Sequence, residues 1–337
     1  MNFWKTLPKP FFVLAPMADV TDAAFRRVIA KYSKPAGPAV MYTEFVSADG
    51  LALAPEEGRK KLLADLMYSE SERPIVAQFF TGRPEMMEKA AILARELGFD
   101  GVDINMGCPD RSIEKQKAGA AAMKDLKLAK EIIAGAMQGA NGLPVSVKTR
   151  LGYNKDELET LLPALLETDL AAITIHARTR KEMSSVPARW ERMKRAVELR
   201  NECQGDALTR TRIIGNGDVN GIADAQAKID ETGADGVMLG RAIFGNPWLF
   251  SNVGFTKPYM PSVKEKLRAM VEHTKLFEEL FVHPALGGAR KSFAIMKKHY
   301  KAYVKDFDGA AELRARLMEA EDADAVARLT NEFCATL

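Results

Sequence analysis

The chain has 337 residues, of which 47% are hydrophobic and 28% are charged, and its formal net charge at pH 7 is +3. This composition is typical of a soluble globular protein with two domains, or with one large α/β barrel and an appendage, and the small net charge does not by itself indicate a polyanionic partner. The three cysteines (Cys108, Cys203 and Cys334) are far apart and the four histidines do not cluster, so we expect no disulfide framework and no metal site. The first apolar run, Phe11 to Ala15, is too short for a signal peptide or a membrane span, and we expect a cytoplasmic protein.

Eight short runs with β-strand character follow one another along the first 250 residues, and helical periodicity fills most of the intervals between them. The predicted strands are Phe11–Met17, Val40–Phe45, Ile75–Phe80, Val102–Met106, Val145–Arg150, Ala172–Arg178, Arg212–Gly217 and Gly236–Arg241. The predicted helices are Thr21–Tyr32, Pro84–Leu97, Leu126–Met137, Asp156–Leu166, Arg189–Leu199 and Ala223–Thr232. This alternation implies parallel crossovers and favours an α/β fold of the (β/α)8 TIM barrel type, with an open doubly wound sheet as the alternative.

The pattern changes after Phe250. Residues 251–262 contain Gly254, Pro258 and Pro261 and are typical of a linker. Helical periodicity over residues 263–281, 290–305 and roughly 310–336 then predicts a smaller all-α domain. We therefore expect a barrel domain at 1–250, a linker at 251–262 and a helical carboxyl-terminal domain at 263–337.

The stretch GVDINMGCP, residues 101–109, is a buried strand that leads into a polar loop. It places the carboxamide of Asn105 and the thiol of Cys108 at the carboxyl end of a strand, where parallel α/β proteins bind ligands. Cys108 is a candidate reactive group, and a small buried cysteine beside a turn is the alternative. The spacing alone does not decide between the two.

Polar residues recur at the ends of most predicted strands, which indicates a pocket for a polar, anionic ligand. These residues are Pro16 and Met17 after the first strand, Gln78 in the third, Asn105 and Cys108 at the fourth, Lys148 and Arg150 in the fifth, His176 and Arg178 at the sixth, Asn216 and Gly217 at the seventh, and Gly240 and Arg241 at the eighth.

The last two loops are where barrel enzymes often bind phosphate, and Gly217 and Gly240 would let a phosphate approach the backbone closely. Lys148 lies in the apolar strand VSVKTR, where an unpaired ammonium is unfavourable, so it needs an anionic or acceptor partner. His176 alone fits a satisfied core histidine, but beside Lys148 and Arg178 we favour a ligand-binding role.

Several stretches resemble the tRNA-dihydrouridine synthases, an FMN-dependent family. They are APMADVTDAAFR, MYTEFVSADGL, NMGCPDRSIEKQKAGAAAM, VSVKTRLG, IHARTR, IGNGDV, GVMLGRAIFGNPWLF and KKHYKAYVKDFDGAAELRARLM. The resemblance covers residues from about 11 to 320, although KEMSSVPARW after HARTR lacks the aromatic and the glycine that many members carry there. It implies reduction of the uracil C5–C6 double bond in tRNA, with FMN as cofactor and NADPH or NADH as reductant.

By this resemblance, each candidate residue acquires a role. FMN would be held by Pro16, Met17, Gln78, Lys148, His176, Asn216, Gly217, Gly240 and Arg241. The target uracil would lie near Asn105, Cys108, Lys148, Arg150 and Arg178, with hydride from reduced FMN and a proton from Cys108. A thiol with an ordinary pKa near 8.5 is mostly protonated at neutral pH, which suits an acid.

The helical stretch 290–305 carries six cations and no acid before residue 306, which favours contact with RNA phosphates over an ordinary solvated face. The cations are Arg290, Lys291, Lys297, Lys298, Lys301 and Lys305. We expect the protein to act as a monomer. The alternatives are an FMN reductase of a small pyrimidine or enone, similar to dihydroorotate dehydrogenase, and a tRNA-binding barrel without catalysis.

Overall fold

The computed structural model describes residues 2–33, 36–205, 210–254, 259–283 and 291–337. Its first part is a sheet of eight parallel strands in the order β1-β8-β7-β6-β5-β4-β3-β2. The strands are β1 (Phe11–Leu14), β2 (Met41–Ser47), β3 (Ile75–Phe80), β4 (Gly101–Asn105), β5 (Val145–Arg150), β6 (Ala172–His176), β7 (Arg212–Asn216) and β8 (Gly236–Leu239).

The sheet closes on itself, which confirms the predicted barrel and excludes the open sheet. β1 pairs with β8 from Phe11 opposite Gly236, and its other edge meets the residues just before β2. There the Leu14 N–H donates to the Val40 carbonyl at 3.1 Å, and the Ala39 N–H donates to the Phe12 carbonyl at 2.8 Å. All strand ends that the sequence marked as polar therefore lie at one rim.

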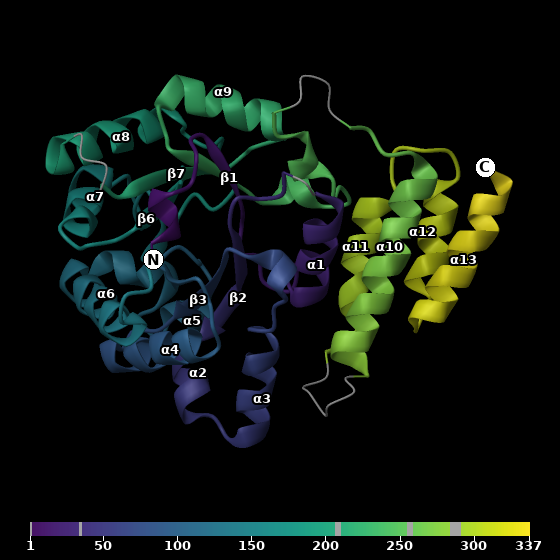
Figure 1. Ribbon diagram of the computed structural model, residues 1–337, viewed down its shortest axis with the longest axis horizontal. Helices are drawn as coiled ribbons and strands as arrows, with labels where there is room; N and C mark the ends of the chain where they lie inside the picture. The colour runs from purple at the N-terminus through teal and green to yellow at the C-terminus, as the bar shows by residue number, and fades with distance from the viewer. Residues whose placement is uncertain (1, 34–35, 206–209, 255–258, 284–290) are drawn as a thin grey trace.

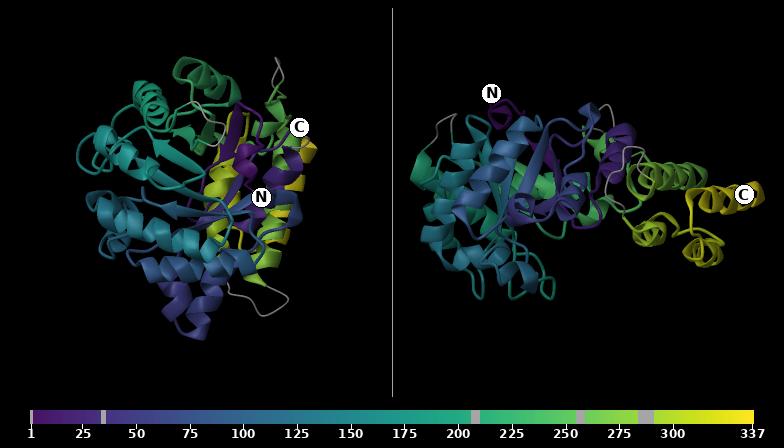
Figure 2. Two further views of the ribbon diagram at one scale, coloured as in Figure 1. Left: turned by 60° about the vertical axis from the view of Figure 1, so that its left-hand side comes forward. Right: turned by 90° about the horizontal axis from the view of Figure 1, so that it is seen from below.

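Helices surround the barrel and cover the outer faces of its strands (Figures 1 and 2). They are α1 (Ala23–Tyr32), α2 (Ala48–Leu53), α3 (Glu56–Ala64), α4 (Pro84–Glu96), α5 (Arg111–Glu114), α6 (Leu126–Ala140), α7 (Leu158–Leu166), α8 (Glu191–Gln204) and α9 (Ile222–Thr232). Short 3-10 helices lie at η1 (Phe3–Lys5), η2 (Glu70–Glu72) and η3 (Gly119–Lys124). Pro84 opens α4 as predicted, because its missing N–H has no role in a first helical turn.

Alternate residues of each strand face two separate cores. On β1, Phe11 and Val13 point into the barrel with Trp4, whereas Phe12 and Leu14 pack against the outer helices. Several strands are shorter than predicted, since β1 ends at Leu14 and β6 at His176. The residues that follow leave the strand direction and form the rim of the site.

Among the described residues between β8 and the carboxyl-terminal domain there is no α-helix. The 3-10 helices η4 (Arg241–Ile243) and η5 (Leu249–Asn252) instead lead to the carboxyl-terminal domain, so the regular structure extends two residues into the predicted linker. This domain contains α10 (Val263–Phe277), the π-helix η6 (Glu278–Val282), η7 (Phe293–Met296), α11 (Lys297–Tyr303), α12 (Ala310–Met318) and α13 (Ala323–Thr336). The predicted helix at 310–336 is thus two helices, because the chain turns between Met318 and Ala323 and Asp322 caps the second one.

The helical domain packs beside α1 at one side of the barrel (Figure 1). Its core joins side chains of α10 to α13 and includes Ala23 and Ala24 of α1. The predicted helix at 290–305 is confirmed only in part: η7 and α11 replace it, and Arg290 lies outside the described residues. In the described parts of the chain, no helix is both long and apolar enough to cross a membrane.

Candidate active site

A cavity of about 700 Å³ opens at the carboxyl ends of the strands. It brings together ten of the residues expected from the sequence. They are Pro16, Met17, Lys148, Arg150, His176, Arg178, Asn216, Gly217, Gly240 and Arg241. The cavity also has Asp218 in its wall, and its charged lining includes four cationic side chains against this one carboxylate. Its chemistry therefore suits an anionic ligand.

Lys148 projects from β5 into this cavity, and no hydrogen bond joins its ammonium to another described residue. Burial, followed by repulsion from Arg150, lowers the pKa of Lys148 to about 8. Arg150 is held by its own partners, because its Nε donates to the Gly107 carbonyl at 2.7 Å. Among the described residues that line the cavity, Lys148 therefore offers an ammonium without a hydrogen-bond partner.

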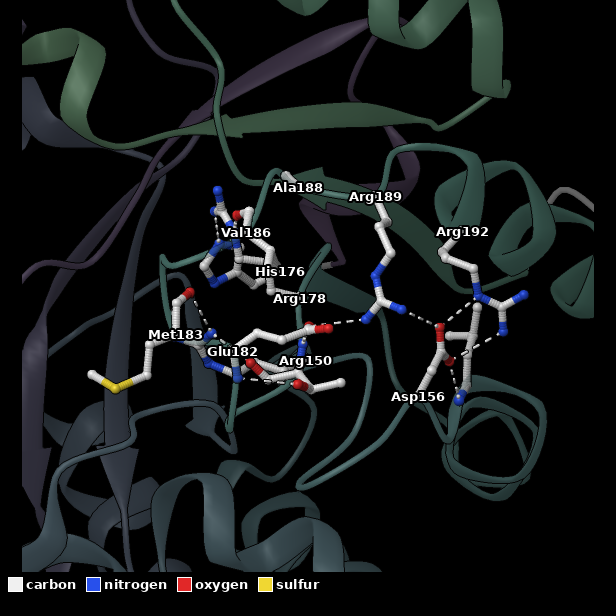
Figure 3. Close-up of polar contacts among 12 residues, drawn as sticks. Arg150, Asp156, His176, Arg178, Glu182, Met183, Val186, Ala188, Arg189 and Arg192 are labelled. Carbon is white, nitrogen blue, oxygen red and sulfur yellow. Dashed lines mark hydrogen bonds and ion pairs between the residues drawn. The ribbon is translucent and has the colours of Figure 1, made fainter.

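His176 and Arg178 form a fixed pair at the end of β6 (Figure 3). Burial, together with the charges of Lys148, Arg150 and Arg178, lowers the pKa of His176 to about 2, so the imidazole is neutral. Arg178 Nη1 lies 3.2 Å from His176 Nε2. Because a guanidinium can only donate, Nε2 must accept, and the ring proton lies on Nδ1. His176 thus has one N–H donor left for a ligand.

Asp218, at the end of the seventh strand, was given no role by the sequence analysis, and it connects Arg178 and Arg241 of this wall. Its carboxylate accepts hydrogen bonds from Arg178 Nη2, from the Ala188 N–H at 2.9 Å and from Arg241 Nη2 at 2.7 Å. Burial opposes ionisation, but these hydrogen bonds hold the pKa of Asp218 below its ordinary value. Asp218 directly follows the motif residues Asn216 and Gly217, which is the signal that could have identified it.

Gly217 is required by the geometry of the same wall. Its φ is +120°, and a Cβ at this position would lie 2.8 Å from Cδ2 of His176. Its carbonyl accepts a hydrogen bond from Nε1 of Trp190 at 2.8 Å. The indole of Trp190 lies against Gly215, where a Cβ would lie 2.4 Å from the ring. The backbone at Gly217 is therefore open to a ligand on one side and fixed on the other.

Cys108 lies in the loop after β4, which Asn105 organises. The Asn105 side-chain oxygen accepts hydrogen bonds from the N–H groups of Gly107 at 3.1 Å and Cys108 at 2.9 Å. The Cys108 side chain packs against a small apolar cluster that contains Phe80 and Ile113. Burial raises the pKa of the thiol above its ordinary value. The group is therefore a protonated thiol at neutral pH and can act as an acid.

Gln78, Asn105 and Cys108 are not among the residues that line the cavity, although Pro109 is. Gln78 is fully buried, donates to Asp103 at 2.6 Å and accepts from Asn105 Nδ2 at 3.2 Å. Burial raises the pKa of Asp103 to about 6. These side chains form a hydrogen-bonded layer behind the cavity, and sequence reasoning missed Asp103 because it sits inside an apolar run.

Of the cations expected to bind RNA, Lys291 differs from the others. Its ammonium forms ion pairs with Glu44 of β2 at 3.0 Å and with Asp65 at 2.6 Å, and its side chain is only 16% exposed. Lys301 is exposed, whereas Lys297 and Lys298 are half-buried. Lys291 therefore joins the helical domain to the barrel. Contact of its ammonium with an RNA phosphate would compete with the ion pairs to Glu44 and Asp65.

The fold and the cavity together define a TIM barrel with a cationic cavity at the carboxyl ends of its strands. The dihydrouridine synthase family profile matches residues 13–336. A protein named probable tRNA-dihydrouridine synthase 2 from Bacillus subtilis is 38% identical over 98% of this chain and 96% of its own. One named probable tRNA-dihydrouridine synthase from Staphylococcus aureus is 38% identical over 98% of this chain and 95% of its own. The chain belongs to the dihydrouridine synthase family.

Two solved structures share the fold. Morphinone reductase in complex with tetrahydroNAD matches 78% of this chain and 92% of its own, with a TM-score of 0.50 and 16% identity. Histamine dehydrogenase from Rhizobium sp. 4-9 matches 79% of this chain and 48% of its own, with a TM-score of 0.52 and 11% identity.

Proposed function

We propose that this protein reduces the C5–C6 double bond of specific uridines in tRNA to give dihydrouridine, with FMN as cofactor and NADPH or NADH as reductant. The observation that carries the proposal is family membership along residues 13–336. The cavity supports it, because an unpaired Lys148 ammonium and a neutral His176 donor face a space large enough for a flavin ring. The same proposal places the protein in the cytoplasm, acting as a monomer.

The residues of the cavity fit FMN. The backbone at Gly217 and Gly240, with the exposed guanidinium of Arg241, would hold the phosphate. Lys148 and His176 would donate to the ring system, while Pro16, Met17 and Asn216 complete the walls. Gln78 would support the site through its hydrogen bonds to Asp103 and Asn105. When bound, FMN supplies the hydride for the reduction.

Cys108 would deliver the proton to the uracil ring. Its raised pKa keeps the thiol protonated, and the Asn105 carboxamide holds the loop that carries it. Hydride addition leaves negative charge on a uracil carbonyl oxygen, and Lys148 and Arg150 are the cations placed to stabilise it. Arg178, which also lines the cavity, would contact the base.

The helical domain would hold the tRNA. A uridine in folded RNA must leave its stack to enter a cavity at the end of a barrel, so the protein must also bind the surrounding backbone. Lys297, Lys298 and Lys301 on α11 offer cations for phosphate contacts. Lys291 would contribute by keeping the two domains in register, and Arg290 is included here on its sequence position alone.

The experiment compares substrates. Purified protein with its bound flavin is mixed with NADPH or NADH and with unmodified tRNA transcript, free uridine or orotate. We expect reduced product from the tRNA alone. Reduction of orotate or an enone with no change in the tRNA would instead identify a small-molecule reductase, and a protein without flavin would identify a tRNA-binding barrel without catalysis.

A further inference from the structure

The loop between β6 and α8, residues 177–190, places one apolar side chain at the mouth of the cavity. Met183 lines the cavity and is 52% exposed. Of the large apolar side chains that the described residues leave exposed, Met183 is the one in this wall. Figure 3 shows its thioether pointing away from the hydrogen-bonded residues around it.

The backbone of Met183 is held in an uncommon conformation. Its φ is +50°, in the left-handed region that residues other than glycine seldom adopt. Such a conformation persists only where the surroundings impose it, and it is concentrated at functional sites. An exposed methionine on an ordinary surface loop needs no such support.

Hydrogen bonds from Arg150 of the cavity and hydrogen bonds within the loop fix the position of Met183 (Figure 3). Arg150 Nη1 donates to the carbonyls of Met183 at 3.5 Å and Thr179 at 3.3 Å. The Glu182 carboxylate accepts from the Thr179 N–H at 2.7 Å and from Arg189 Nη2 at 2.9 Å. The tip of the loop is therefore tied to a cation of the site.

Two further elements hold the base of the loop. Arg180 donates its N–H to the Gly152 carbonyl at 2.9 Å and forms an ion pair with Glu114 of α5. Arg189 lies 3.6 Å from Asp156, which also pairs with Arg192 of α8 at 2.8 Å. A loop backbone held in this way loses little further conformational freedom when the loop contacts a partner.

Four exposed lysines lie in this loop and in the adjoining loops. Lys181 precedes Met183, Lys155 follows the segment that bonds to this loop, and Lys115 and Lys117 follow α5. None of these four has an ion pair to another described residue. An exposed apolar tip, with unpaired lysines in its own loop and in the adjoining loops, has the chemistry of a surface that contacts RNA bases and phosphates together.

We infer that Met183 is a wedge that enters the RNA stack where the target uridine leaves it. The inference rests on the proposed function, because only a base in folded RNA has to be unstacked before it reaches the cavity. Apolar side chains inserted between bases stabilise an opened stack, and an unbranched thioether adapts its shape to the gap. Met183 is a positioning residue that acts on the neighbours of the reacting base.

The test measures base extrusion and turnover separately. The tRNA carries 2-aminopurine next to the uridine that the wild-type protein reduces, and its fluorescence rises when the neighbouring stack opens. We expect Met183→Ala to abolish this rise and to lower kcat/KM on tRNA roughly tenfold or more, with flavin content and flavin reduction by NADPH unchanged. Met183→Leu, which fills a similar volume, should stay within about threefold of wild type.

The matched control is Leu97→Ala. Leu97 is also an exposed apolar residue, 40% accessible, but it follows α4 at the opposite end of the barrel. This variant should behave as wild type. Normal fluorescence rise in Met183→Ala, with or without loss of turnover, would overturn the wedge. A wild-type protein that forms no dihydrouridine would overturn the proposed function, and the wedge with it.

Discussion

The guanidinium of Arg180 donates two hydrogen bonds to the carboxylate of Glu114, one from Nε to Oε1 at 2.7 Å and one from Nη2 to Oε2. Arg180 belongs to the loop after β6, and Glu114 ends α5, six residues after Cys108. This pair therefore connects the loop that would carry the proton donor with the loop that would carry the substrate contact Arg178. The two loops are positioned as one unit.

Glu114→Ala should separate these loops. We expect kcat on tRNA to fall roughly five- to tenfold with flavin binding unchanged, because a displaced catalytic group loses rate faster than it loses affinity. Stability should change by about 1 kcal/mol or less, since the pair is partly exposed. Steady-state kinetics and thermal unfolding check this. Glu56→Ala, which removes an exposed ion pair with Lys60 on α3, is the control, and equal kinetic losses in both variants would contradict the prediction.

Gly217→Ala should prevent flavin binding. The new Cβ would lie 2.8 Å from Cδ2 of His176, and φ of +120° is unfavourable for alanine, so the wall of the cavity must shift. The flavin absorbance of the purified variant, compared with its protein absorbance, measures the loss. Gly221→Ala is the matched control, because nothing lies within 4 Å of a Cβ there and its φ of 169° is extended backbone. Full flavin content in Gly217→Ala would show that the cofactor lies elsewhere.

Much of the barrel could be predicted from the sequence because its strands are continuous apolar runs with abrupt ends. The bounds of β3 and β5 agree with the prediction because both strands are flanked by clear signals. Pro74 precedes β3 and Thr81 follows it, while Pro144 precedes β5 and Gly152 follows shortly after. The helices α2 and α3 were not predicted. α3 buries only Ala64, so its sequence lacks the apolar period by which a helix is recognised.

The candidate site was predicted to the extent that parallel topology brings all carboxyl ends of strands to one rim. The rest depends on side-chain direction and on partners far apart in the sequence. Gln78 lies on a strand that ends at the predicted rim, but its carboxamide is hydrogen-bonded to Asp103 and Asn105. Lys291 and Lys301 look alike in the sequence, yet Lys291 is paired with carboxylates of the barrel and Lys301 is exposed. No local pattern separates such cases.

Replacing Lys297, Lys298 and Lys301 together by alanine should weaken tRNA binding and flatten its salt dependence. Each lost phosphate contact lowers the slope of log K against log salt by about 0.7 to 0.9. Lys291 is left in place because its removal would leave Glu44 buried without its cation.

Binding titrations at several salt concentrations provide the measurement. The control replaces three exposed lysines on the outer helices α4, α6 and α8, namely Lys89, Lys127 and Lys194. If the α11 variant and this control keep the same affinity and slope as wild type, α11 has an ordinary solvated face.

His273 and His299 form a buried pair between the domains, and none of their four ring nitrogens has a hydrogen-bond partner among the described residues. Burial lowers the pKa of both rings, to about 3 for His273. The folded protein therefore keeps them neutral while the unfolded chain binds protons below pH 6.5, so stability falls as the pH drops. One such histidine destabilises the fold by about 1.4 kcal/mol at pH 5.5.

His299→Phe should remove the part of the pH dependence of stability that one histidine contributes, because a phenyl ring does not titrate. The phenyl ring can keep the stacking against Phe244. Denaturant unfolding at pH 8 and pH 5.5 gives the comparison. The difference in unfolding free energy between the two pH values should shrink by about 1.4 kcal/mol relative to wild type. An unchanged difference would mean that His299 is not neutral in the folded protein.

The most direct test of the central claim is nucleoside mass spectrometry of unmodified tRNA transcript after incubation with the protein and NADPH. We expect one or more specific uridines to gain two hydrogens with the wild-type protein. Cys108→Ala should retain its flavin and its tRNA affinity and give at most about one hundredth of that product in the same time. A tRNA that gains no mass from a flavin-loaded wild-type protein that oxidises NADPH would contradict the proposed activity, and full product from Cys108→Ala would contradict the role of the thiol.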